Sequence, residues 1–145
     1  MNIFEALRQE HEIQRKLAAQ LVDTANADIE DRKKIFENLK HELKIHADAE
    51  ERHFYIPLME KDLTQQKARH SVAEHHEMDE LIEQLEDMEM DKNKWLQSAK
   101  DLQHLIEHHL KEEEHEVFQM AGKALTEKQK TSLAADYNKE IRKNR

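Results

Sequence analysis

Two stretches of the chain each carry a histidine followed four residues later by a glutamate: His46 with Glu50, and His109 with Glu113. In an α-helix this spacing is about one turn, so both side chains of each pair leave the same face. The surrounding sequence also corresponds, because residues 50–55 align with residues 113–118. In both stretches the face with the histidine and glutamate also carries the apolar residues. Imidazole and carboxylate groups on a buried helix face are donors that suit a metal ion.

Two further histidines, His11 and His75, lie within the apolar stripes of two other predicted helices. Buried carboxylates and imidazoles without partners are unfavourable, so a compensating charge is required. A metal ion supplies that charge, and the absence of thiolate ligands favours iron, manganese or zinc. Each glutamate could bridge two ions, with open positions left for a small ligand. The predicted metal ligands are His11, His46, Glu50, His75, His109 and Glu113.

Hydrophobic periodicity predicts four long helices, over about 3–25, 28–59, 65–89 and 91–120. Pro57 is expected to kink or end the second of these, because it removes one helical hydrogen bond. Thr126 and Gln129 have the spacing of a capping box, which predicts a fifth, shorter helix packed on the outside. Since the connections are short, we predict an all-α fold: an up-down-up-down four-helix bundle with an appended short C-terminal helix, forming a single domain over 1–145.

The composition supports this fold class and excludes several functions. Of 145 residues, 38% are charged and 5% aromatic, with one glycine and one proline, which is typical of a helical bundle. The net charge of -9 argues against nucleic acid and anionic membranes as partners. The absence of cysteine excludes disulfides, thiolate ligands and iron–sulfur clusters. No signal peptide or membrane span is visible, so we expect a cytoplasmic protein.

Simpler interpretations exist for single residues. His46 and Glu50 alone could be an ordinary ion pair, and a lone histidine is more often a core or boundary residue than a ligand. His53 lies on the inner stripe and could be an extra ligand or support one, whereas Tyr55 is assigned to the core. Other histidines lie off the apolar stripes and are predicted to be solvated: His41, His70, His76, His104 and His108. Three glutamates are assigned to a charged outer face: Glu51, Glu112 and Glu114.

The order of these motifs resembles the hemerythrin-like, or HHE cation-binding, domains. One histidine on the first helix, His-x-x-x-Glu on the second, one histidine on the third and His-x-x-x-Glu on the fourth match that family over about residues 3–120. Flanking residues correspond too, including Arg8-Gln-Glu-His11 and Glu74-His75. The resemblance implies two iron ions, oxo- or hydroxo-bridged, that bind or react with dioxygen, nitric oxide or peroxide. By position it implies four terminal ligands, His11, His46, His75 and His109, and two bridges, Glu50 and Glu113.

The sequence departs from the oxygen-carrying hemerythrins at two positions. Their third helix carries a second ligand histidine, where this chain has Asp79; whether Asp79 binds metal or water fills that position stays open. Their fourth-helix carboxylate is an aspartate five residues after the histidine, whereas here Glu113 follows His109 at four. The nearer resemblance is to the broader bacterial-type HHE group. A poorer histidine set argues against stable, reversible oxygen carriage.

Three function classes remain compatible with the sequence. The first is a di-iron binding protein that binds, senses or scavenges O2, NO or peroxide. The second is a redox enzyme that consumes peroxide or NO on the same residues. The third is a metal-free helical interaction module with pH-sensitive histidines. A small diatomic ligand or peroxide is the expected partner, and the sequence does not identify a protein partner.

Overall fold

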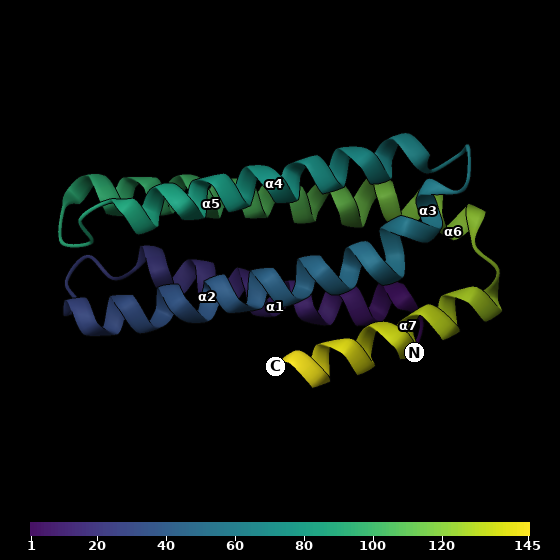
Figure 1. The fold of residues 1–145 in the computed structure, drawn as a ribbon, viewed down its shortest axis with the longest axis horizontal. Coiled ribbons are helices and arrows are strands. Elements are labelled where there is room, and N and C mark those ends of the chain that lie inside the picture. The colour runs from purple at the N-terminus through teal and green to yellow at the C-terminus, as the bar shows by residue number, and fades with distance from the viewer.

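The computed structural model describes residues 1–145 and contains helices but no strands (Figure 1). The predicted all-α class is therefore confirmed. Two π-helical segments, η1 (Glu51–Tyr55) and η2 (Glu113–Val117), continue α2 and α5 without a break. The α-helices are α1 (Ile3–Val22), α2 (Ile29–Glu50), α3 (Ile56–Met59), α4 (Gln65–Asp87), α5 (Asn93–Glu112), α6 (Phe118–Ala124) and α7 (Glu127–Asn144).

The long helices lie side by side in two pairs, α1 with α2 and α4 with α5 (Figure 1). The α1–α2 and α4–α5 connections lie at one end of the molecule, and the α3–α4 connection lies at the other. Helix α1 also contacts α5, and α7 packs against α1 and α2. The capping box predicted for the fifth helix is present, since the Thr126 hydroxyl accepts from the Gln129 backbone N–H at 3.1 Å and the Gln129 side chain accepts from the Thr126 N–H at 2.8 Å.

Pro57 does not interrupt the second long helix at its own position. The Ile56 N–H bonds to the Glu51 carbonyl five residues back, which is π-helical bonding, and the chain continues as α3 to Met59. Pro57 lies in the first turn of α3, where a missing N–H is tolerated. The widened turn before Pro57 therefore accommodates the ring, and the helical stretch ends at Met59, in agreement with the predicted range of 28–59.

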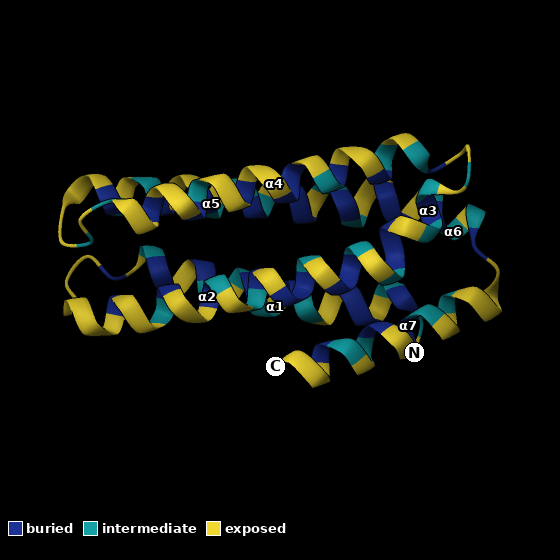
Figure 2. Cartoon of the chain, in the orientation of Figure 1, coloured by how far each residue is buried: buried dark blue, intermediate teal, exposed yellow.

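The apolar core consists of two clusters, and buried polar residues lie between them. Along α1, His11 lies between Leu7 of the first cluster and Ala18 of the second. Buried positions face inward on all four long helices (Figure 2). Helix α7 extends the first cluster with Ala134, Tyr137 and Ile141, as predicted for a helix packed on the outside. None of the helices is both long and apolar enough to cross a membrane.

Candidate metal centre

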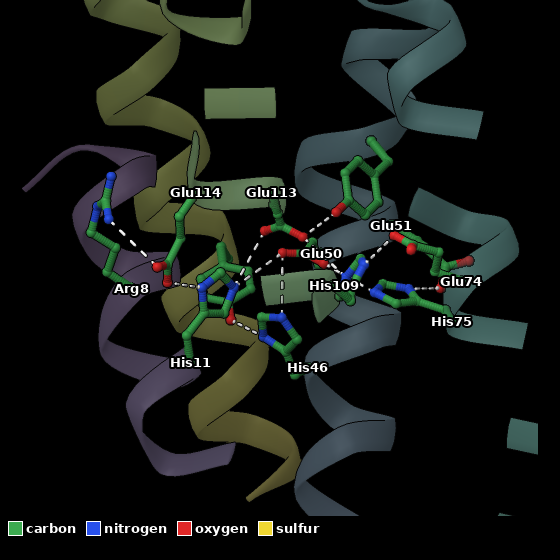
Figure 3. Close-up of polar contacts among 12 residues, drawn as sticks. Arg8, His11, His46, Glu50, Glu51, Glu74, His75, His109, Glu113 and Glu114 are labelled. Carbon is green, nitrogen blue, oxygen red and sulfur yellow. Dashed lines mark hydrogen bonds and ion pairs between the residues drawn. The ribbon is translucent and has the colours of Figure 1, made fainter. Parts of the chain in front are cut away.

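The fold brings all six predicted ligands into one place between the two apolar clusters (Figure 3). All six are buried, and none is more than 6% exposed. They come from α1, α2, α4, α5 and the first residue of η2. The donor atoms form two groups, and within each group all atoms lie within 4.8 Å of one another. One group contains His11 and His46, the other contains His75 and His109, and Glu50 belongs to both.

The carboxylate of Glu50 faces both pairs of histidines. Its Oε2 lies 3.3 Å from His46 Nε2 and 3.7 Å from His11 Nε2, whereas its Oε1 lies 3.2 Å from His75 Nε2. One carboxylate thus presents a different oxygen to each side. This is the arrangement needed of a carboxylate that bridges two cations.

The two carboxylate oxygens of Glu113 also face different histidines. Its Oε1 lies 3.3 Å from His11 Nε2, and its Oε2 lies 3.2 Å from His109 Nε2. Tyr55 donates its phenolic hydrogen to Glu113 Oε2. The site is therefore pseudo-symmetric, with two imidazoles and one oxygen from each glutamate on either side.

Six of the eight donor atoms that face the centre have no hydrogen-bond partner. This holds for the Nε2 atoms of His11, His46 and His109, for both oxygens of Glu50, and for Glu113 Oε1. Buried polar atoms in proteins are almost always satisfied, so unpaired atoms gathered in one place require an explanation. Cations between the two carboxylates would contact these atoms, so the residues present fit a metal site of nitrogen and oxygen ligands.

The opposite nitrogen of each imidazole is held by a residue outside the centre. Such contacts fix the ring orientation and the tautomer that leaves Nε2 free for a metal. Three of the partners are carboxylates and one is a phenol. The Nδ1 contacts are His11 with Glu114 at 2.7 Å, His46 with Tyr137 at 2.6 Å, His75 with Glu51 at 3.0 Å and His109 with Glu74 at 2.8 Å.

This outer set of partners was not predicted from the sequence. Glu51 and Glu114 were assigned to a charged outer face, which is wrong for their carboxylates, since both contact a buried imidazole. A signal was present, because each directly follows a predicted bridging glutamate, so that both copies read Glu-Glu. Tyr137 comes from α7, and only the packing of that helix on α1 and α2 places its hydroxyl beside His46.

Other residues considered from the sequence lie away from the centre. His53 Nε2 contacts Glu140 Oε1 at 2.9 Å and none of the six. Asp79 is exposed, at the edge of a small cavity that borders His46, His75 and His109. The five histidines predicted to be solvated are all exposed.

In the metal-free protein the electrostatics of the site favour positive charge beside its buried carboxylates. Burial lowers the pKa of His75 and His109, but contacts with Glu50 and Glu51, and with Glu113 and Glu74, outweigh it and raise the two pKa values to about 10 and about 9. Burial likewise opposes ionisation of Glu50, yet the neighbouring histidines hold the pKa of that carboxyl well below its ordinary value. Protons on the imidazoles therefore occupy the electrostatic role that a metal cation would take.

Comparisons with known proteins concern the family and the fold of this chain. The family model described as Hemerythrin HHE cation binding domain matches residues 2–121. A comparison with curated protein sequences returned no match. A crystal structure of a Hemerythrin HHE cation binding domain-containing protein from Mycobacterium kansasii is similar to this chain with a TM-score of 0.88 and 19% identity, covering 99% of this chain and 87% of that one. At this identity the likeness concerns the fold.

Proposed function

The chain belongs to the hemerythrin HHE cation-binding family, and we propose that it holds two iron ions in the core of an up-down-up-down four-helix bundle and there binds, senses or scavenges O2, NO or peroxide. The observation that carries this proposal is the set of buried, unpaired donor atoms that face one another across Glu50 and Glu113. A metal-free interaction module would leave these atoms unsatisfied in the core.

The residues divide into two proposed ligand groups. His11 and His46 would hold one ion with Glu50 Oε2 and Glu113 Oε1, because these are the oxygens nearest to their Nε2 atoms. His75 and His109 would hold the other with the remaining two oxygens. Iron bound there would supply electrons to a small oxidant and open coordination positions to a small ligand.

A small cavity gives the proposed ligand a place beside the histidines. It measures about 10 Å³ and is bordered by residues of α1, α2, α4 and α5. Gln14 lies on its wall, 2% exposed, with an amide nitrogen that has no hydrogen-bond partner. Leu43 and Met78 form part of its apolar wall. A space of this size holds about one water molecule, so the cavity selects for very small ligands.

Substitution of Gln14 tests whether its amide contacts that ligand. The Gln14→Leu variant keeps a side chain of similar size but removes the buried donor. The loss of one hydrogen bond, about 0.5–1.5 kcal/mol, should weaken NO binding to the ferrous protein by roughly 2- to 13-fold. Spectral titration with NO measures this, and Gln20→Leu, an exposed position of the same helix, is the matched control. Unchanged NO affinity at equal iron content would show that Gln14 does not contact the ligand.

The reaction with O2 tests the proposed function itself. Only six ligand residues are provided by the chain, and Asp79 is exposed at the cavity edge instead of being a further imidazole. We therefore expect O2 to oxidise the ferrous protein to a stable ferric form that deoxygenation does not reverse. Stopped-flow absorption with air-saturated buffer measures this. An absorption band that disappears on deoxygenation and returns over repeated cycles would identify an oxygen carrier instead, and absent iron binding would overturn the proposal.

A further inference from the structure

A second cluster of histidine and glutamate side chains lies at the outer surface of α4 and α5. It repeats the four-residue spacing of the inner pairs, with His70 before Glu74 on α4 and His108 before Glu112 on α5. The two helices pack against each other, so the two pairs face one another. The sequence places His70, His108 and Glu112 on solvated faces, and only the packing of α4 on α5 brings them together.

Three residues of this outer cluster, His70, Glu74 and Glu112, have donor atoms that all lie within 4.8 Å of one another, and His108 contacts both glutamates. His70 Nε2 lies 3.6 Å from Glu74 Oε2 and 3.4 Å from Glu112 Oε1. His108 Nε2 lies 3.8 Å from Glu74 Oε2 and 3.3 Å from Glu112 Oε2. A tetrahedral ion with bonds of about 2.0–2.2 Å keeps its ligands about 3.3–3.6 Å apart. Three of these four separations, 3.3, 3.4 and 3.6 Å, fall within that range, and the distance from His108 Nε2 to Glu74 Oε2 is slightly longer at 3.8 Å.

No lysine or arginine forms an ion pair with either carboxylate of the cluster. Glu74 and Glu112 form ion-pair contacts only with histidines. The carboxylates are largely covered, with side chains 7% and 19% exposed, whereas the imidazoles of His70 and His108 are 54% and 62% exposed. A surface hollow of about 520 Å³ borders the cluster at His108 and Glu112. Two shielded carboxylates therefore meet two imidazoles at a position open to solution.

We propose that His70, Glu74, His108 and Glu112 form a second, solvent-accessible site for a divalent cation such as Zn²⁺, distinct from the inner centre. Imidazole nitrogen and carboxylate oxygen are ordinary zinc ligands, and their number suits tetrahedral coordination. The site adjoins the inner one through Glu74, whose Oε1 accepts the Nδ1 hydrogen of His109 while its Oε2 faces the outer cluster. A surface cation is thus separated from the inner centre by one carboxylate and one imidazole.

The competing interpretation is that these residues form two independent His–Glu pairs, each within one helix. Such pairs on a surface contribute little to stability and hold no ion. The two interpretations differ in one measurable quantity, the number of cations bound per chain. The outer histidines are exposed and contact none of the six inner residues, so their removal leaves all six proposed inner ligands in place.

Equilibrium dialysis of the metal-free full chain against Zn²⁺, followed by metal analysis, tests the proposal. Zinc also enters the inner centre, so the comparison is between variants. We expect wild type to bind one zinc ion more per chain than the His70→Ala/His108→Ala double variant. The matched control is His41→Ala/His76→Ala, which removes two exposed histidines of α2 and α4 and should bind as much zinc as wild type. Equal zinc counts for wild type and the His70/His108 variant would overturn the proposal.

A second measurement locates the ion without any substitution. In crystals of the wild-type protein soaked with Zn²⁺, the anomalous signal of zinc should give a peak within about 2.0–2.2 Å of His70 Nε2 and of a Glu112 oxygen. A crystal in which zinc occupies the inner centre but gives no peak between α4 and α5 would contradict the outer site. Because the two peaks are separate, failure of one site is distinguishable from failure of the other.

Discussion

The Glu50→Ala variant should lose both metal ions, whereas removal of a single terminal histidine should leave at least one. Glu50 is fully buried, and its two oxygens face different histidine pairs, so its loss takes a donor from both proposed ligand groups. Loss of a residue that only hydrogen-bonds to a metal ligand already lowers metal affinity by about 10- to 100-fold. We therefore expect Glu50→Ala to weaken metal binding by more than about 100-fold.

Metal analysis after anaerobic iron loading measures this effect. Glu50→Gln is the conservative comparison, since it keeps the volume but removes one oxygen donor and the charge. His46→Ala takes a donor from one group only, because its Nε2 faces Glu50 Oε2 alone. His76→Ala is the control, as His76 is exposed and should leave the iron content unchanged. If His46→Ala empties the site as completely as Glu50→Ala, the bridging role of Glu50 is wrong.

Metal binding should raise the stability of the fold strongly, because the proposed ligands come from all four long helices. A ligand that binds only the folded state at 1,000 times its dissociation constant contributes about 4 kcal/mol. For a domain of this size each kcal/mol corresponds to about 2–4 °C, so the melting temperature should rise by roughly 8–16 °C. Thermal unfolding with and without a chelator measures this. Equal melting temperatures near neutral pH would contradict it.

The metal-free and metal-loaded forms should respond to pH in opposite directions. In the metal-free protein the pKa values of His75 and His109 are raised from 6.5 to about 10 and about 9, so the folded state binds protons more tightly than the unfolded state. Their contribution to stability is fully present below pH 6.5 and is lost as the pH rises through about 9 and 10. Metal binding needs neutral imidazole and must displace these protons, so metal affinity rises over the same range.

A pH series of unfolding measurements on both forms checks this prediction. The gap in melting temperature between the metal-loaded and metal-free protein should widen as the pH rises from neutral toward 9. Adding the metal back after chelation should restore the melting temperature of the metal-loaded protein, which separates metal loss from irreversible damage. If the gap in melting temperature narrows with rising pH, the imidazoles of His75 and His109 do not both bind protons in the metal-free protein and bind the metal.

The sequence alone predicted the helical class, the four long helices and the six residues that meet in the core. These features depend on local periodicity, and helical spacing reports which side chains share a face. The ligand pairs His46/Glu50 and His109/Glu113 were visible because each lies within one turn of one helix. The two departures from oxygen-carrying hemerythrins, Asp79 and Glu113, were also readable from position alone.

The tertiary structure decided what surrounds those six residues. Glu51 and Glu114 were placed on the outer face by regular 3.6-residue spacing, but they lie in π-helical segments, where a wider turn changes the direction of the side chains. Tyr137 beside His46 and the outer cluster at Glu74 and Glu112 both join residues of different helices. Periodicity gives the face of a helix, but only packing determines which faces meet, and the partners of the buried imidazoles depend on that contact.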